Sequence, residues 1–155
     1  MELKNVYRGR IREYVEQYPS AKYVGDGAKP WFEKADIACP CATQNELNEE
    51  AAKALVANGV IAVAEGANMP STPGAIKVFQ DAKILYSPGK ASNAGGVSVS
   101  GLEMSQNSER LSWSSEEVDA KLLWIMENIH ENCVNYGTEP DGYVNYVKGA
   151  NVAGF

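Results

Sequence analysis

Residues 93–100 combine features of a site that holds a small anionic ligand. The run NAGG at residues 93–96 is expected to begin a helix, with Lys90 just before it and the hydroxyls of Ser98 and Ser100 after it. Backbone N–H groups at a helix start are free to donate, and the helix dipole adds to their attraction for an anion. Glycine also lets a ligand approach the backbone closely. This segment therefore suits a substrate or cofactor that carries a carboxylate.

Two further polar loops contain residue types that bind ligands. The loop CPCATQNE covers residues 39–46, and the loop AEGANMPSTPG covers residues 64–74. Each follows an expected strand, as does the segment that leads into residue 93. The carboxyl ends of parallel strands meet at one edge of a sheet, where ligands bind. Each loop taken alone is also compatible with ordinary turn chemistry.

The cysteines and the single histidine offer a weaker candidate for chemistry. A zinc site can be imagined from Cys39, Cys41, Cys133 and His130. Paired zinc ligands are usually separated by about two to four residues, whereas only Pro40 separates the first two cysteines. Because free cysteine behaves as a small apolar residue, buried or loop thiols are favoured, and no metal site is expected. A nucleophilic Cys/His pair is a less favoured alternative, and His130 is expected on a helix surface.

Strands and helices alternate in the middle of the chain. Residues 36–39 are expected to form a buried strand and residues 83–86 another strand. The continuous apolar run at residues 60–64 is typical of a central strand of a parallel sheet that is covered on both faces. A helix with Leu47 on its apolar face separates the first two strands in chain order. A second helix, with Pro73 at its first position, separates the last two. The alternation predicts an α/β fold with a parallel sheet.

Further elements are expected towards both ends of the chain. The pattern Ser114-x-x-Glu117 is a capping box, which typically begins a helix. Residues 21–24 are compatible with a short strand. Apolar residues at three- and four-residue spacing predict further helices, over residues 2–17, 92–113, 115–137 and around 143–147.

Composition restricts the class of protein. The chain has 155 residues, is 45% hydrophobic and carries a net charge of −6. A chain of this size can bury about two thirds of its unfolded surface, so one domain without disulfide or metal support is expected. The acidic balance argues against nucleic-acid binding. The longest apolar runs have five residues, whereas a membrane helix needs about 20, and the first residues do not read as a signal peptide. A soluble, cytoplasmic protein is therefore expected, without a membrane partner.

Four segments together resemble a known family. CPCATQNE, AEGANMP, NAGGVSVSGLEMSQNSERLSW and the final GANVAGF are similar, in order and spacing, to the carboxyl-terminal portion of hexameric NAD(P)-dependent glutamate dehydrogenases. The resemblance covers essentially the whole chain. It implies a partial Rossmann-like parallel sheet, the second half of a dinucleotide-binding domain, at residues 1–90. Carboxyl-terminal helices that return toward the substrate domain are implied at residues 91–155.

The resemblance also implies an activity and site residues. The family catalyses reversible oxidative deamination of L-glutamate to 2-oxoglutarate and ammonia with NAD or NADP, as a homohexamer. Ser100 falls where the family hydrogen-bonds the side-chain carboxylate of glutamate, and Val97 where it lines the aliphatic part. Asn68 and Asn93 fall where family asparagines approach the nicotinamide and its ribose. The loop beside the cofactor is matched by Ala42, Thr43 and Gln44.

The departures from the family pattern are equally informative. Neither the Gly-x-Gly-x-x-Gly fingerprint nor a phosphate-binding P-loop string occurs in the chain. Nothing matches the family's substrate domain, which supplies the lysines and the acidic residue for catalysis. No catalytic residue is therefore expected here, Ser98 and Lys90 are expected to be structural, and the chain is interpreted as a fragment that is inactive alone. The alternative is a free-standing, non-catalytic nucleotide-binding or assembly module.

Overall fold

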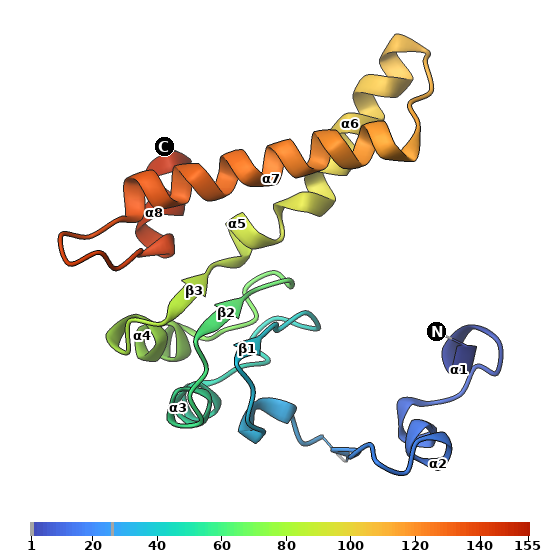
Figure 1. Cartoon of the computed structure of the whole chain (residues 1–155), viewed down its shortest axis with the longest axis vertical. Coiled ribbons are helices and arrows are strands. Elements are labelled where there is room, and N and C mark those ends of the chain that lie inside the picture. The colour runs from blue at the N-terminus through green and yellow to red at the C-terminus, as the bar shows by residue number, and fades with distance from the viewer. Residues whose placement is uncertain (1, 26) are drawn as a thin grey trace.

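The computed structural model describes residues 2–25 and 27–155 (Figure 1). The elements in chain order are α1 (Glu2–Asn5), η1 (Ile11–Glu13), α2 (Tyr14–Gln17), η2 (Pro30–Phe32), β1 (Ile37–Ala38), α3 (Glu49–Ala57), β2 (Ala62–Ala64), α4 (Pro73–Asp81), β3 (Leu85–Ser87), α5 (Gly89–Ser92), α6 (Ala94–Glu109), α7 (Ser115–Gly137) and α8 (Tyr146–Ala153).

The three strands form one parallel sheet in the order β1-β2-β3, which confirms the predicted α/β fold. Ala38, Val63 and Tyr86 are aligned across the strands and are all buried. They belong to one apolar core with residues of α3 and α4, such as Leu55 and Phe79. Figure 1 shows these two helices on the same side of the sheet. The core therefore lies between one face of the sheet and the two crossover helices.

The opposite face of the sheet is more exposed, so the expectation that residues 60–64 are covered on both faces is met only in part: Val63 is buried, whereas Ala62 and Ala64 on the other face are half-buried. Successive side chains of a strand point to opposite faces. Ile37 and Leu85 each precede a buried residue by one position and therefore point to the opposite face, where they are 58% and 47% exposed. Both helices that connect the strands pack on the other side, which leaves this face without a covering layer from α3 or α4.

The single helix predicted over residues 2–17 is replaced by three short segments. The first helix ends at Asn5, Arg8 has a positive φ of 52°, and Gly9 donates its N–H to the carbonyl of Leu3 at 2.9 Å. Figure 1 shows this end of the chain away from the sheet. An amphipathic helix gains most of its stability from packing of its apolar face. Ile11, at 77% exposure, illustrates that this stripe is not covered by the sheet or its helices within the described residues. The possible strand at residues 21–24 is also absent from the described structure.

The helices after β3 follow the predicted order. The capping box at the start of α7 is present: the Ser114 hydroxyl accepts from the Glu117 N–H at 3.2 Å, and the Ser114 N–H donates to the Glu117 carboxylate at 2.7 Å. α7 and α8 cross at close range at Gly149. A Cβ added there would lie 2.0 Å from the Cys133 carbonyl oxygen. Only glycine permits this approach. Within the described ranges, no helix has both the length and the apolar character required to cross a bilayer.

Replacement of Ser114 by alanine should lower the free energy of unfolding by about 1 kcal/mol, because the first turn of α7 loses its side-chain acceptor. Urea unfolding followed by circular dichroism measures this change. Ser112→Ala, at an exposed position just before the cap, is the matched control and should change stability by less than about 0.5 kcal/mol. Equal losses in the two variants would contradict the role of the cap.

Candidate functional site

The loops after β1 and β2 are joined by backbone hydrogen bonds at the carboxyl edge of the sheet. The carbonyl oxygen of Pro40 accepts from the N–H groups of Gly66 and Ala67 at 2.9 and 3.1 Å. Further along, Asn45 donates to Met69 at 3.0 Å, and additional bonds join Leu47 to residues 70 and 72. The predicted meeting of these two loops is confirmed. Their paths are set mainly by backbone groups.

The loop that contains Ala42, Thr43 and Gln44 is closed by its own glutamate. One carboxylate oxygen of Glu46 accepts from the N–H of Ala42 at 2.8 Å and from the N–H of Thr43 at 3.3 Å. All three predicted residues are exposed. The backbone of this loop is therefore fixed, while its side chains are available to a ligand.

The structure brings Asn68 and Asn93 into direct contact. The side-chain amide of Asn93 donates to the Asn68 carbonyl oxygen at 2.7 Å and to the backbone oxygen of Ala67 at 3.2 Å. These contacts join the loop after β2 to the start of α6. The resemblance assigns both asparagines to the cofactor, and the structure places their side chains in contact with each other.

Val97 and Ser100 lie on α6 at four and seven residues beyond Asn93, which places all three on one side of the helix. Val97 is 73% exposed. The hydroxyl of Ser100 is exposed and donates to the carbonyl of Gly96 at 3.2 Å. The chain itself does not enclose these two side chains, and Asn68 is exposed as well, whereas Asn93 is half-buried.

The start of α6 differs from the free helix start expected at residue 93. The short helix α5 leads directly into it, and the N–H of Asn93 already donates to the carbonyl of Gly89 at 2.9 Å. Ser98 and Lys90 have structural partners, as expected. The Ser98 hydroxyl donates to Ala94 in its own helix at 2.7 Å, and the Lys90 amine donates to the side-chain oxygen of Asn151 on α8.

Glu65 is a central residue of this region that sequence reasoning did not single out. Its side chain is buried at the end of β2 and accepts from the Tyr86 hydroxyl, the Gly89 N–H and the Ser71 N–H at 2.7, 2.7 and 3.3 Å. Burial, together with the hydrogen bond and charge of Glu65, raises the pKa of Tyr86. Tyr86 therefore remains a donor at neutral pH. The sequence signal was an acidic residue directly after the apolar run of residues 60–64.

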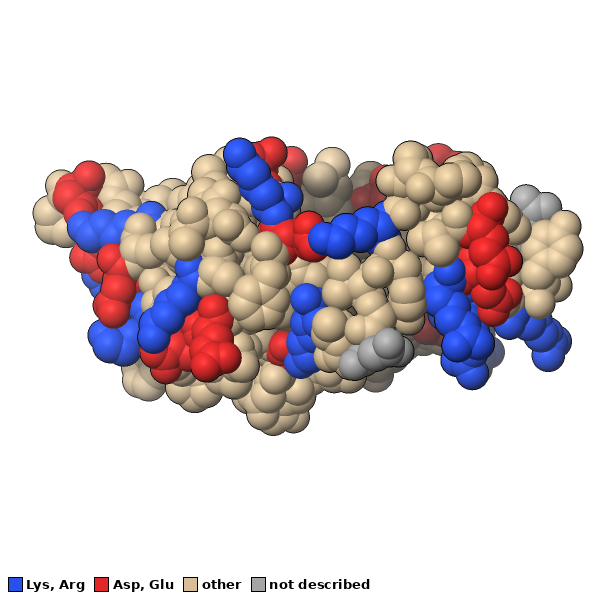
Figure 2. Space-filling model, turned by 90° about the horizontal axis from the view of Figure 1, so that it is seen from below, with Lys and Arg blue, Asp and Glu red and all other residues tan. Residues whose placement is uncertain are grey.

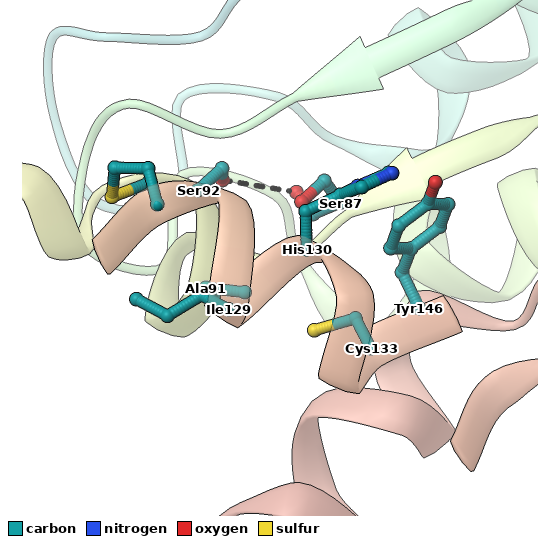
Figure 3. Close-up of a pocket in the computed structure, with 8 residues that line it drawn as sticks. Ser87, Ala91, Ser92, Ile129, His130, Cys133 and Tyr146 are labelled. Carbon is teal, nitrogen blue, oxygen red and sulfur yellow. Dashed lines mark hydrogen bonds between the residues drawn. The ribbon is translucent and has the colours of Figure 1, made fainter. Parts of the chain in front are cut away.

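Cys133 and His130 line a cavity of about 230 Å³ between the end of β3 and helices α5, α7 and α8 (Figure 3). Burial raises the pKa of the Cys133 thiol, which disfavours the nucleophilic thiolate. The hydroxyl of Ser92 already donates to the backbone oxygen of Glu65 at 2.6 Å. Cys39 and Cys41 are exposed. Within residues 2–25 and 27–155, no three potential ligands among His, Cys, Asp and Glu are grouped to hold a metal.

Opposite charges are mixed over the surface. On the face seen in Figure 2, Lys and Arg side chains alternate with Asp and Glu side chains rather than forming a basic surface. Pairs such as Lys53–Glu49 and Lys77–Asp81 lie one helical turn apart, at 2.6 and 3.0 Å. Exposed pairs of this kind contribute little to stability.

Comparisons with known proteins cover the whole chain. The family model for Glutamate/Leucine/Phenylalanine/Valine dehydrogenase matches residues 1–155. The NAD(P)-specific glutamate dehydrogenase of Xylanibacter ruminicola is 76% identical over 155 residues, which are 100% of this chain and 34% of that protein. The glutamate dehydrogenase of Bacteroides thetaiotaomicron is 77% identical over 155 residues, with the same coverage of 100% and 34%.

A solved structure agrees in fold as well as in sequence. The crystal structure of Plasmodium falciparum glutamate dehydrogenase matches with a TM-score of 0.90 and 47% identity, over 99% of this chain and 33% of that one. The chain thus spans about a third of the length of these relatives. Because the family model matches every residue, this chain belongs to the Glutamate/Leucine/Phenylalanine/Valine dehydrogenase family.

Proposed function

We propose that this chain is the part of a glutamate dehydrogenase that binds the nicotinamide end of NAD or NADP and the side-chain carboxylate of glutamate. The complete enzyme would interconvert L-glutamate with 2-oxoglutarate and ammonia. The observation that carries the proposal is the direct contact between Asn68 and Asn93 at the carboxyl edge of the sheet. The high identity to two glutamate dehydrogenases supports the choice of substrate.

The polar groups at the asparagine pair fit a nicotinamide nucleotide. The Asn93 amide nitrogen and the Asn68 carbonyl oxygen are used in their mutual hydrogen bond. This leaves the Asn68 amide nitrogen as a donor and the Asn93 carbonyl oxygen as an acceptor, with no hydrogen bond assigned to either among the described residues. A carboxamide or a ribose hydroxyl needs such a donor and acceptor. A nicotinamide held at Asn68 and Asn93 would supply the hydride acceptor for oxidation at the α-carbon of glutamate.

On α6, the proposed roles are substrate recognition and positioning. The Ser100 hydroxyl would donate to the side-chain carboxylate of glutamate, and Val97 would pack against its methylene groups. A substrate without that carboxylate would lose this charge-assisted hydrogen bond and would bind more weakly. Ala42, Thr43 and Gln44 would contact the cofactor from the neighbouring loop.

The remaining parts of the proposal concern the complete protein. The domain boundary would fall near residue 90, where the sheet gives way to the helices. The rest of the protein would supply the lysines for catalysis. Lys90 is the lysine closest in sequence to Asn93, but its amine is bonded to Asn151. We further propose a homohexamer in the cytoplasm.

A chimera tests the proposed function. If this chain replaces the matching 155 residues of the Bacteroides thetaiotaomicron enzyme, we expect glutamate-dependent NAD(P)H formation comparable to that of the unaltered enzyme. The isolated chain, assayed in parallel, should show no turnover because it lacks the groups for proton transfer. A folded but inactive chimera would contradict the proposal. Nucleotide binding by the isolated chain in that case would favour the non-catalytic module.

Ser100→Ala in the same chimera should lower kcat/KM for glutamate by about 10- to 100-fold, since a hydrogen bond to a charged group contributes about 1.5–3 kcal/mol. Steady-state kinetics at saturating cofactor measure this change. Ser98→Ala is the matched control on the same helix. Both hydroxyls donate to the carbonyl four residues earlier, but residues two apart lie on nearly opposite sides of a helix, so Ser98 does not share the side that carries Val97 and Ser100. Similar losses in both variants would exclude a specific role for Ser100.

A further inference from the structure

The carboxylate of Glu65 is buried, and among the described residues its partners are hydrogen-bond donors without a positive charge. Its residue exposure is only 3%, and none of the ion pairs found among the described residues includes it. A buried charge is costly unless several donors surround it. One oxygen accepts from the Tyr86 hydroxyl and the Ser71 N–H, and the other accepts from the Gly89 N–H. Two of these three donors are backbone groups.

The backbone of Glu65 is bonded to the same neighbouring segment. Its N–H donates to the carbonyl of Ser87 at 3.2 Å, and its carbonyl accepts from the Ser92 hydroxyl at 2.6 Å. Residue 65 is therefore attached by both its backbone and its side chain to the connection between β3 and α5. This fixes where the loop after β2 begins.

The attachment extends to the two asparagines. A Cβ at Gly89 would lie only 2.7 Å from the carbonyl oxygen of Ala67, so the loop and α5 are in close contact there. The amide of Asn93 donates to that same oxygen and to Asn68. A change in the Glu65–Gly89 contact would therefore displace Asn68 relative to Asn93.

We propose that Glu65 is a positioning residue for the nicotinamide cofactor, because its carboxylate sets the separation of Asn68 and Asn93. This inference rests on the proposed function, which places the cofactor at those asparagines. Glu65 itself does not contact the reacting atoms. It acts through the loop and the helix that it joins.

Charge and acceptor pattern, rather than size, define this role. A glutamine has nearly the same shape, but one of its two terminal atoms is a donor. If its amide nitrogen faces Gly89, two donors meet there. If the side chain is turned over, the amide nitrogen meets the Ser71 N–H instead. Either orientation leaves a backbone N–H without an acceptor, so the loop must shift.

The test is Glu65→Gln in the chimera described above. We expect the KM for NAD(P) and the dissociation constant for NAD(P)H, measured by fluorescence, to rise at least about tenfold, because small displacements of positioning groups are costly. The KM for glutamate, at saturating cofactor, should change by less than about twofold. Tyr86→Phe removes a donor but leaves both backbone N–H groups paired, so a smaller rise is expected.

A core variant separates positioning from a general loss of stability. Leu55→Val weakens the core within α3, a helix that carries none of the residues bonded to Glu65. It should lower the melting temperature while the cofactor KM is unchanged. An unchanged cofactor KM in Glu65→Gln, or an equal rise in Leu55→Val, would overturn the inference while the proposed function stands. An inactive parent chimera would instead overturn the proposed function and this inference with it.

A second variant keeps the inference testable if Glu65→Gln does not fold. Gly89→Ala leaves the carboxylate in place but introduces a Cβ 2.7 Å from the Ala67 oxygen. It should raise the cofactor KM without raising the KM for glutamate. A normal cofactor KM in a folded Gly89→Ala variant would contradict the proposed control of the Asn68–Asn93 separation.

Discussion

A carboxylate removed from water requires donors that converge on it, and in this chain the donors of Glu65 come from three different places. The start of the α4 connection supplies Ser71, β3 supplies Tyr86, and α5 supplies Gly89. The requirement to satisfy one carboxylate thus links the loop after β2 to β3 and to the following helix. Stacking of Tyr86 on Phe79, with ring centroids 5.5 Å apart, connects the same arrangement to the apolar core. Core packing and loop geometry are therefore parts of one structure.

The elements that sequence predicted well are those with a local physical signal. Pro73 after an N-cap threonine marked α4, and the pair Ser114 and Glu117 marked the start of α7. Short apolar runs marked the three strands. The helix expected over residues 2–17 was wrong because the described part of the chain leaves most of its apolar stripe exposed. A periodic pattern records what a helix would bury, but the surroundings determine whether that helix forms.

The site was predictable to a similar degree. Parallel strands place their following loops at one edge, so the meeting of the loops that contain Ala42 and Asn68 followed from topology. The roles of Val97 and Ser100 came from resemblance alone, and their exposed positions on α6 give no independent indication of a ligand. Glu65 was missed because its importance depends on donors that are six to 24 residues away in sequence. Such a convergence is visible only in three dimensions.

The backbone bonds between the loops after β1 and β2 have an evolutionary consequence. Because Pro40, Gly66 and Ala67 hold these loops together through main-chain atoms, substitutions at exposed positions such as Thr43 and Gln44 can alter what the surface recognises without altering its shape. Main-chain hydrogen bonds do not depend on side-chain identity. A loop pair built in this way can diverge in ligand preference among relatives while the underlying framework is inherited unchanged.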